Sequence, residues 1–490
     1  MKSNVKTIIL IILGTIFAYP ILINANFSYF GGYNSENLEV DIESKIKRAG
    51  FWNIDPIEID NSNPNSNWSK TANENDWCNG NGSLSNPYVI ENVTFNNPTG
   101  YGIKIINSKT EYFTIRNVTV YSAYYGGIKL ENTNNGTIMN NNFSNNGWIA
   151  IYLDNSNANN ISGNTLNNND QGIFLRWSNN NTLSGNTANN NYYGIYLARS
   201  NNNTLSGNTV NNNNIYGLKL IESNDNIISG NTANDNRDGI FLSDSNNSTL
   251  SGNTANNNEV GIFLDASSDN NNISGNTINN NTQNGISLAY SYNNIISGNM
   301  MNECGLGLSG SFEELLSHRI GTTNLVNGKP LYYYTNKVNL DSSNFTNAGQ
   351  VLLVNCSDSL ILNLNTSYSS KGISLYYCNN NTLSGNTANN NDQGIFLRWS
   401  NNNTLSGNTA NYNRYGIYLS RSSSNTVSGN NLMGNDECIV EEDCQGNVFR
   451  DNGSCSYGET GQPIPGYNLF FLLGILSVIS IIISIKLKKS

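Results

Sequence analysis

The sequence predicts an all-β protein, a right-handed parallel β-helix built from a repeat of about 22 residues. Three observations predict it: regularly spaced glycines, a short alternating apolar segment after each of them, and asparagine blocks between these segments. The spacing is shown by Gly172, Gly194, Gly217, Gly239, Gly261 and Gly285, with successive intervals of 22, 23, 22, 22 and 24 residues. Periods in this range are typical of solenoids, in which each coil stacks on the next.

Each repeat is expected to supply three short strands. The first follows the glycine, as at 173–175, where apolar side chains alternate at the spacing of two that marks a half-buried strand. A second apolar position, such as Leu183, precedes Ser-Gly-Asn-Thr, and a third, such as Ala188, follows it. No segment of the repeat is long enough or suitably periodic for a helix, which excludes helical and leucine-rich solenoids. The glycine column and its substitutes, which include Gly307, Gln350 and Cys438, predict about fifteen coils.

The asparagines are predicted to lie at the turns. Two columns of the alignment are formed by Asn181, Asn203, Asn226, Asn271 and Asn294, and by Asn186, Asn208, Asn231, Asn253, Asn276 and Asn299. Stacked identical amides can hydrogen-bond along the axis as ladders, and asparagine tolerates the left-handed backbone of sharp turns. We therefore expect most of the asparagine content to be structural.

Both ends of the sequence carry targeting signals. Residues 1–25, with two lysines, an apolar run and Ala25, read as a secretory signal peptide, with an uncleaved anchor as the alternative. Residues 468–486 are long and apolar enough for a transmembrane helix, preceded by a linker at 456–467. The basic tail at 487–490 would lie in the cytoplasm. The protein is therefore predicted to be anchored in the plasma membrane, with the β-helix on the cell surface.

The body between these signals divides into four predicted regions. Residues 26–84, with an amphipathic stretch at 38–49, are expected to cap the open strand edges of the first coil. The β-helix is predicted at 85–306 and 350–455, and the second part ends in a cysteine-containing cap. The pattern lapses at 307–349, where we expect an insertion with a helical turn at 313–318 and a protruding loop around Asn327-Gly328-Lys329-Pro330.

Composition limits the partners. The net charge is −10 and only 12% of the residues are charged, and an acidic chain without a basic stripe is a poor ligand for nucleic acid. Asn-x-Ser/Thr sequons fit an extracellular glycoprotein. They begin at Asn92, Asn117, Asn142, Asn160, Asn180, Asn202, Asn246, Asn272, Asn344, Asn380, Asn402 and Asn452.

The coil pattern Gly-Ile-x-Leu, Asn-Asn-Thr-Leu-Ser-Gly-Asn-Thr resembles the right-handed β-helix repeats of the NosD type, which are common on archaeal surface proteins. The resemblance covers about 77–452 and includes Asp76-Trp77-Cys78-Asn79-Gly80 at the entry and Asn327-Gly328-Lys329-Pro330 in the irregular region. The order Pro465-Gly466-Tyr467, apolar span and basic tail is also similar to archaeal sorting tails. The resemblance implies the fold, whereas such repeats occur in sugar-binding, sugar-cleaving, copper-maturation and plain surface proteins.

Aromatic and arginine side chains after the first strand are the best candidates for contacting carbohydrate, because flat aromatic faces suit sugar rings. The candidate residues are Arg176, Trp177, Arg199, Tyr290, Tyr376, Tyr377, Arg398, Trp399 and Arg421. The segments 167–189 and 389–411 are identical, so the Arg-Trp pair occurs twice. We interpret the identity as a recent duplication. The alternative is that the two pairs form a bivalent sugar-binding surface.

A tethered polysaccharide lyase or glycoside hydrolase is the first alternative. Asp244 and Asp265 fall on neighbouring coils within reach of a shared cation such as calcium, and Arg199 and Glu222 lie just before them. The sequence has no Asp-Asp or Asp-x-Asp cluster, which argues against the commonest arrangements. We expect these residues to be a solvated edge and the protein to be non-catalytic.

Copper handling is the second alternative. The soft ligands gather only at Met300, Met301, Cys304 and His318, and packing explains them better than a metal site. Candidate disulfide residues are Cys356 with Cys378, on consecutive coils, and Cys438, Cys444 and Cys455 near the end; the first two can equally be stacked free thiols. No metal site or cofactor is therefore predicted, apart from the calcium considered above.

Overall fold

The computed structural model describes residues 52–453. The predicted signal peptide (1–25), the cap segment at 38–49, the linker (456–467), the transmembrane helix (468–486) and the tail (487–490) lie outside these residues. Within residues 52–453, no helix is long and apolar enough to cross a membrane.

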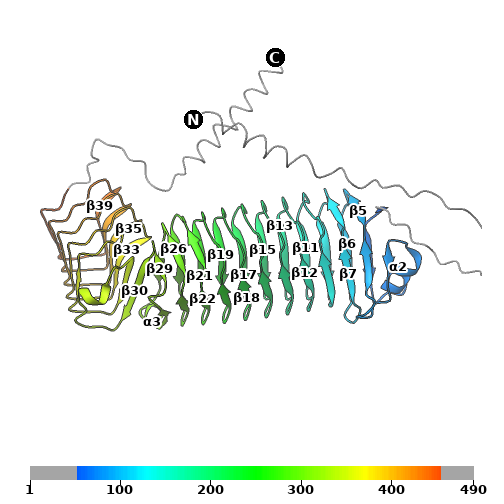
Figure 1. Cartoon of the computed structure of the whole chain (residues 1–490), viewed down its shortest axis with the longest axis horizontal. Coiled ribbons are helices and arrows are strands. Elements are labelled where there is room, and N and C mark those ends of the chain that lie inside the picture. The colour runs from blue at the N-terminus through cyan, green and yellow to red at the C-terminus, as the bar shows by residue number, and fades with distance from the viewer. Residues whose placement is uncertain (1–51, 454–490) are drawn as a thin grey trace, which may run out of the picture. The chain divides into compact units, whose positions relative to one another are not determined.

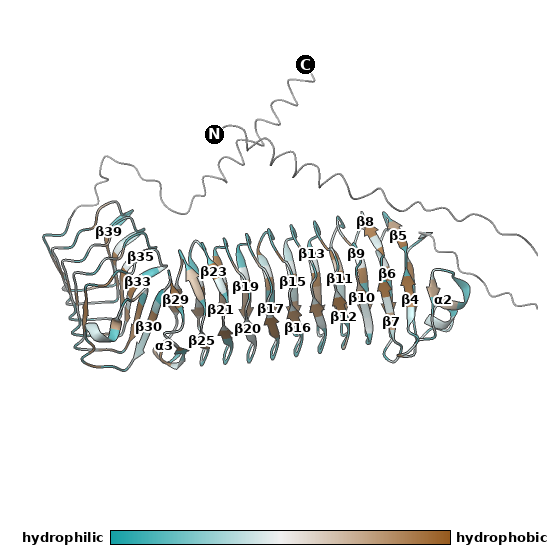
Figure 2. Ribbon diagram, viewed as in Figure 1, coloured by the Kyte–Doolittle hydropathy of each residue, from teal (hydrophilic) through white to brown (hydrophobic). Residues whose placement is uncertain are grey.

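The described residues form a right-handed parallel β-helix of about 16 turns with about 22 residues per turn, as predicted (Figure 1). Each coil has a long-strand face, a short-strand face and a third face on which most pairings are single bridges. Figure 2 shows hydrophobic residues along the strands and hydrophilic residues at the turns. We call the coils up to β29 the first stack and those from β30 the second stack.

Three sheets line the first stack. The long-strand face consists of β2 (Ile57–Asp60), β6 (Tyr101–Ile106), β9 (Gly126–Glu131), β11 (Ile149–Asp154), β13 (Gln171–Arg176), β15 (Tyr193–Ala198), β17 (Tyr216–Ile221), β19 (Asp238–Ser243), β21 (Val260–Asp265), β24 (Asn284–Ala289) and β27 (Leu306–Ser309). The short-strand face consists of β3 (Cys78–Asn79), β4 (Tyr88–Glu91), β7 (Phe113–Arg116), β10 (Gly136–Met139), β12 (Asn160–Ser162), β14 (Thr182–Ser184), β16 (Thr204–Ser206), β18 (Ile227–Ser229), β20 (Thr249–Ser251), β22 (Asn272–Ser274), β25 (Ile295–Ser297) and β28 (Arg319–Ile320). The strands of the third face are β1 (Trp52–Asn53), β5 (Val93–Asn96), β8 (Thr119–Tyr121), β23 (Thr277–Asn279), β26 (Met300–Asn302) and β29 (Leu325–Val326).

Two sheets line the second stack. Its long strands are β30 (Lys329–Thr335), β31 (Gln350–Val354), β33 (Lys371–Tyr376), β35 (Gln393–Arg398), β37 (Tyr415–Ser420) and β39 (Glu437–Glu442). Its short strands are β32 (Leu360–Leu362), β34 (Thr382–Ser384), β36 (Thr404–Ser406), β38 (Thr426–Ser428) and β40 (Val448–Arg450).

Inward-facing side chains explain the repeat. Ile173, Leu183 and Ala188, one from each face of a coil, are fully buried. The glycine column is required because a side chain there would enter the next coil. A Cβ on Gly194 would lie 2.5 Å from the carbonyl oxygen of Gly217 and 2.9 Å from the Cβ of Val210.

The two asparagine columns form the predicted ladders. In one, the backbone N–H of Asn181 donates to Oδ1 of Asn203 at 2.8 Å, and in the other the N–H of Asn186 donates to Oδ1 of Asn208 at 3.0 Å. A third ladder, which the sequence analysis missed, follows the remaining corner. Its members are Asn146, Asn169, Asn191, Asn213, Asn236, Asn258 and Asn281. Each ladder satisfies backbone groups that the turns leave unpaired.

The N-terminal end of the first stack is covered by helix α2 (Trp68–Glu74). Asn67 is its N-cap, and the Asn67 Oδ1 accepts from the backbone N–H of Lys70 at 2.9 Å. Trp68 is 1% exposed, its ring lies 5.1 Å from those of Tyr88 and Phe113, and its indole N–H donates to Oγ of Ser108. The described part of the predicted cap region thus covers the core, and β1 and β2 within it already belong to the first coil.

The predicted insertion at 307–349 is largely a coil, whereas the predicted helical turn at 313–318 is present as helix α3 (Phe312–Ser317). Strands β27, β28 and β29 continue the three faces, with helix α3 and the 3₁₀ helix η1 (Ser342–Phe345) added. The register pairs Ser287 with Gly307, so Gly305 rather than Gly307 belongs to the glycine column. Asn327 and Gly328 have φ of 52° and 74° and join β29 to the antiparallel β30, so this segment is a hairpin turn rather than a protruding loop.

The second stack closes the end of the first. Leu352, Val354 and Tyr376 lie on the outer side of its long-strand sheet and share one buried cluster with Leu306 and Leu308 of β27. The inner side of the same sheet builds a separate core. The outer surface near β33 is therefore covered, and the predicted site residue Tyr376 is buried there.

The cysteines decide between the alternatives considered above. Cys356 and Cys378 are free thiols, and Cys378 Sγ accepts from the backbone N–H of Cys356 at 3.3 Å. Serine hydroxyls fill this place elsewhere, as Ser200 does for Ser178 at 3.0 Å. Cys438 is disulfide-bonded, Cys444 is a free thiol, and Cys455 lies outside the described residues. Residues 438–450 contribute to the further coil of β39 and β40 rather than to a separate cap.

His318 ends the first asparagine ladder and makes the fold sensitive to acid. Its Nδ1 accepts from the backbone N–H of Asn294 at 3.3 Å, and burial lowers the pKa of His318 to about 4. Since an unfolded histidine has a pKa of about 6.5, the unfolded chain binds more protons between these values. Stability should therefore fall as the pH is lowered from about 6.5 to about 4.

Denaturation at a series of pH values checks this prediction. The His318→Gln variant should lose the part of the pH dependence that falls in this window, and the chain has no other histidine. An unchanged pH profile in the variant would contradict the assigned role.

Candidate functional site

The predicted carbohydrate-binding residues mostly lie in one column, at the corner between the long-strand and short-strand faces. The predicted residues in this column share positive φ values near 50° and are Trp177, Arg199, Tyr290, Tyr377, Trp399 and Arg421, together with Glu222 and Asp244 of the enzymatic alternative. The corner is a sharp turn repeated in every coil, and its side chains form a narrow stripe. Tyr376 does not belong to it: this side chain is fully buried, and its hydroxyl donates to the carbonyl oxygen of Leu308.

Most charged groups of this stripe are neutralised by partners on adjacent coils. Arg199 forms a two-bond ion pair with Glu222, at 2.8 and 3.1 Å. Arg421 lies 3.4 Å from Asp443. These pairs join one coil to the next along the axis, so the stripe offers little free charge.

The acidic residues of the enzymatic alternative lie in two neighbouring columns. Asp244 aligns with Ala266, and Asp265 aligns with Ser243, so the two carboxylates stand one column apart. Glu222 is occupied by Arg199. Within residues 52–453, no three His, Cys, Asp or Glu side chains are placed to hold a metal ion, so the calcium considered for this pair has no third ligand of these types there.

The two Arg-Trp pairs have different surroundings despite their identical sequences. Arg176 lies 4.4 Å over the ring of Trp177, which is 43% exposed. Trp399 stacks on Tyr377, with ring centroids 4.6 Å apart and an 18° interplanar angle. A neighbouring ring thus covers one face of Trp399, and a guanidinium group lies over each of the two indoles.

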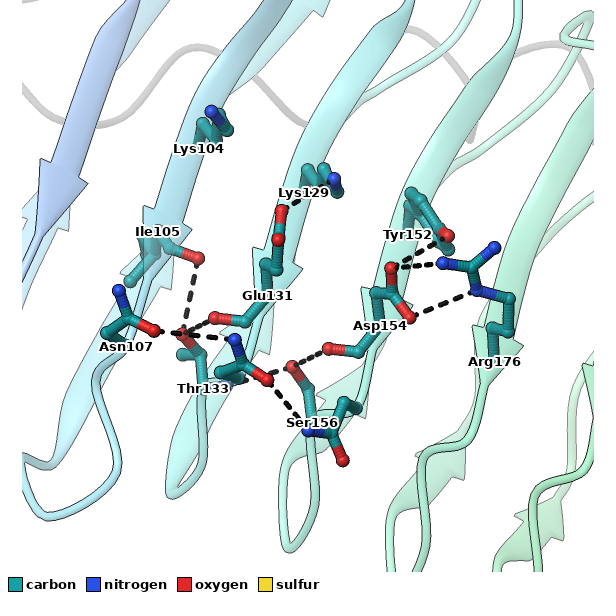
Figure 3. Close-up of polar contacts among 12 residues, drawn as sticks. Lys104, Ile105, Asn107, Lys129, Glu131, Thr133, Tyr152, Asp154, Ser156 and Arg176 are labelled. Atoms are coloured by element: carbon teal, nitrogen blue, oxygen red, sulfur yellow. Dashed lines mark hydrogen bonds and ion pairs between the residues drawn. The ribbon is translucent and has the colours of Figure 1, made fainter.

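Aromatic rings also stack along the long-strand face. Tyr152, Phe174 and Tyr196 have successive centroid distances of 5.2 and 4.8 Å and interplanar angles of 9° and 23°. Each ring covers the face of its neighbour, so this ladder stabilises the stacking of coils. Figure 3 shows the charged residues beside it, where Lys129 pairs with Glu131 and Arg176 with Asp154.

A different corner holds the most open aromatic cluster, between the third face and the long-strand face. Tyr124 is 70% exposed, and Tyr125 and Trp148 are each 44% exposed. Tyr124 stands at 71° to Tyr125, with ring centroids 5.0 Å apart, and Trp148 is tilted at 53° to Tyr125. Tyr125 stacks on Tyr101, with ring centroids 5.8 Å apart and a 26° interplanar angle, so one of its faces is covered, whereas Tyr124 and Trp148 are not stacked on another ring of residues 52–453.

The cluster forms the wall of a hollow of about 780 Å³, which we call the aromatic hollow. Its lining residues are Ser122, Ala123, Tyr124, Tyr125, Asn145, Asn146, Gly147, Trp148 and Asn168. Asn145 and Asn168 are exposed and joined by an amide hydrogen bond of 3.0 Å, whereas Asn146 belongs to the third ladder. Aromatic faces beside amide groups suit sugar rings and their hydroxyls.

Sequence reasoning missed the aromatic hollow, although a signal was present. Tyr125 and Trp148 precede the glycine column by two residues, and Tyr192 occupies the same place on a later coil. An alignment column with recurrent aromatic residues at a corner would have identified this site.

None of the predicted sequon asparagines is buried. Those that are exposed are Asn117, Asn142, Asn160, Asn180, Asn202, Asn272, Asn380 and Asn402, and those that are partly exposed are Asn92, Asn246, Asn344 and Asn452. The ladder asparagines beside them, such as Asn181 and Asn203, point inward. Asn452 belongs to both groups, because its Oδ1 accepts from the backbone N–H and the side-chain amide of Asn430 at the end of a ladder.

Fold and repeat define a right-handed β-helix protein, and comparison with known families specifies its class. A family described as periplasmic copper-binding protein (NosD) matches residues 209–320 and 317–454, together half of the chain. A family described as right handed beta helix region matches residues 77–233. The chain belongs to the NosD family.

Similar solved structures include phage and bacterial proteins. The Dettilon tailspike protein is 14% identical, with a TM-score of 0.40, and the match covers 61% of this chain and 60% of the tailspike. The periplasmic alginate epimerase AlgG is 15% identical, with a TM-score of 0.26, and the match covers 82% of this chain and 85% of the epimerase. At these scores the likeness does not bear on ligand or activity. No curated protein matches the chain at a significant level.

Within residues 52–453, the soft donors considered above do not form a site that fits the copper named in the family description. Copper(I) favours thiolate and thioether ligands, and copper(II) favours imidazole. Met301 is fully buried in the core, whereas Met300 on the same strand is 47% exposed, so the two side chains diverge. Cys304 is buried and its thiol contacts the carbonyl oxygen of Ile278, while Nδ1 of His318 is occupied by the ladder. These donors do not converge on one point.

Proposed function

We propose that this protein is a non-catalytic, surface-displayed β-helix that binds carbohydrate through the aromatic hollow. The observation that carries the proposal is the set of three exposed, mutually tilted rings at one corner, flanked by exposed amides. Exposed apolar clusters of this kind with a polar rim mark interaction sites. Sugar rings match this chemistry because they have apolar faces and many hydroxyl groups.

The proposed placement is outside the cytoplasm. The family description names a periplasmic protein, and the sequence predicts a signal peptide and a C-terminal anchor on either side of the β-helix. The exposed sequons fit glycosylation of the surface. In this arrangement, the membrane is one partner, reached through the C-terminal helix, and glycans or envelope components are the others.

The proposal predicts which substitutions abolish glycan retention. On a glycan array, the Trp148→Ala and Tyr124→Ala variants of the full-length protein should lose binding by at least about tenfold. The reason is that aromatic side chains which become buried on binding dominate such interfaces. Trp177→Ala is the matched control, since Trp177 is 43% exposed and Trp148 is 44% exposed.

The control also decides between the two aromatic corners. Equal losses for Trp177→Ala and Trp148→Ala would contradict the assignment to the hollow. Loss of binding for Trp177→Ala alone would place the binding site in the stripe at the corner between the long-strand and short-strand faces.

A further inference from the structure

The identical segments 167–189 and 389–411 provide an internal comparison of one arginine in two settings. Arg176 faces Asp154 on the preceding coil, with Nε–Oδ1 at 3.1 Å and Nη2–Oδ2 at 2.7 Å (Figure 3). Arg398 faces Tyr376 at the equivalent register position. We call 167–189 the first copy and 389–411 the second copy. The second copy therefore lacks the carboxylate that neutralises the arginine of the first copy.

Nothing in the described chain replaces this carboxylate. The guanidinium of Arg398 makes no ion pair or hydrogen bond to another residue of 52–453, and its Nε is buried without a partner. The group lies 4.2 Å over the ring of Trp399. A buried donor without a partner is costly, and in native structures it indicates a missing water, ion or ligand.

A second cation lies on the same face. Lys371 stands opposite Gln393 on the neighbouring strand, where the first copy has Ile149 opposite Gln171. Its Nζ lies 4.2 Å over the ring of Phe396 and makes no ion pair among the described residues. Burial lowers the pKa of Lys371 to about 8, with Asp392 opposing this effect. The exchange of Ile149 for Lys371 and of Asp154 for Tyr376 makes the second copy more cationic.

A small cleft lies beside Arg398. It has a volume of about 220 Å³ and is lined by Gln393, Phe396, Arg398, Tyr418, Ser420, Arg421 and Glu442. Glu442 accepts from the hydroxyls of Tyr418 and Ser420, at 2.8 and 3.2 Å. The acidic group of the cleft is thus hydrogen-bonded to two hydroxyls, and no carboxylate of residues 52–453 forms an ion pair with Arg398.

We propose that this cleft binds the carboxylate of an acidic sugar, with the terminal guanidinium nitrogens of Arg398 as donors and Lys371, which lies over the Phe396 ring outside the cleft lining, as a supporting charge. The Arg176–Asp154 pair shows that an arginine at this position can bind a carboxylate. In the second copy the buried Tyr376 takes the place of Asp154, so the sugar carboxylate would approach Arg398 from the cleft. Phe396 and Tyr418 would line the sugar ring, and the Gln393 amide would meet its hydroxyls. The inference extends the proposed function by naming a class of glycan, and it concerns a site separate from the aromatic hollow.

Calorimetric titration of the full-length protein with oligoglucuronate tests the proposal. Arg398→Gln should weaken binding at least about tenfold, because a charge-assisted bidentate contact is lost. Arg176→Gln, in the identical sequence, should leave the affinity unchanged. Lys371→Met removes no hydrogen bond between coils and should also weaken binding, by a smaller factor.

Three outcomes would overturn the proposal: equal losses for Arg398→Gln and Arg176→Gln, equal affinity for the uncharged oligoglucoside, or equal affinity for acetate alone. The aromatic hollow can be judged separately, because retention of neutral glycans should respond to Trp148→Ala and not to Arg398→Gln.

Discussion

Replacing Trp68 with alanine should lower the free energy of unfolding of the N-terminal coils by about 4 kcal/mol. The indole is 1% exposed, lies against two aromatic rings and donates to Ser108. Its removal leaves a cavity at the end of the hydrophobic column and an unpaired serine hydroxyl. Because each coil of a solenoid is supported only by its neighbours, the loss should begin at the end that Trp68 covers.

Amide hydrogen exchange during denaturant titration measures this effect coil by coil. In the Trp68→Ala variant, protection should fall first in β4 and β7 and remain highest in the middle of the first stack. Trp148→Ala removes an equally large but half-exposed side chain and should cost well under half as much. Similar losses in the two variants would show that Trp68 does not act as a cap.

Replacing Asn208 with aspartate should destabilise the first stack by about 3 kcal/mol. The Asn208 Nδ2 group donates to the carbonyl oxygen of Leu183 and to Oδ1 of Asn231, both at 2.9 Å. Aspartate keeps the acceptor for Asn186 but turns this donor into a buried oxygen that faces two other oxygens. The loss falls in the middle of a ladder, where both adjacent coils depend on it.

Asn212→Asp is the control for this substitution. Asn212 is exposed and has a φ of 56°, a conformation that aspartate also tolerates. Chemical denaturation should detect a large shift for Asn208→Asp and almost none for Asn212→Asp. A neutral Asn208→Asp variant would mean that the ladders are not a main source of stability.

The repeat could be predicted from sequence because spacing alone determines which residues face inward. Ile173 and Leu183 are buried as the periodicity required. The third ladder was missed because three consecutive asparagines at 189–191 give no sign of which one turns inward, and the structure selects Asn191. The hairpin at Asn327-Gly328 was misread as a loop because its partner strand β30 begins a new sheet rather than the next repeat.

The candidate site was less predictable because the surroundings of its residues are set by contacts between different coils. Tyr376 is buried because β27 covers it. Arg398 has no ion-pair partner among residues 52–453 because Tyr376, rather than an aspartate, stands opposite it one coil earlier. Identical local sequences therefore acquired different environments. The aromatic hollow needed segments of three consecutive coils to be brought together, which no single motif encodes.

The most direct test of the account is a glycan-array screen of the full-length protein, followed by analysis of the chain length of the bound glycans. The account predicts that glycans are retained at full length and are released by Trp148→Ala. Shortened glycans, or no retention of any glycan, would contradict the central claim that this β-helix is a non-catalytic carbohydrate-binding protein.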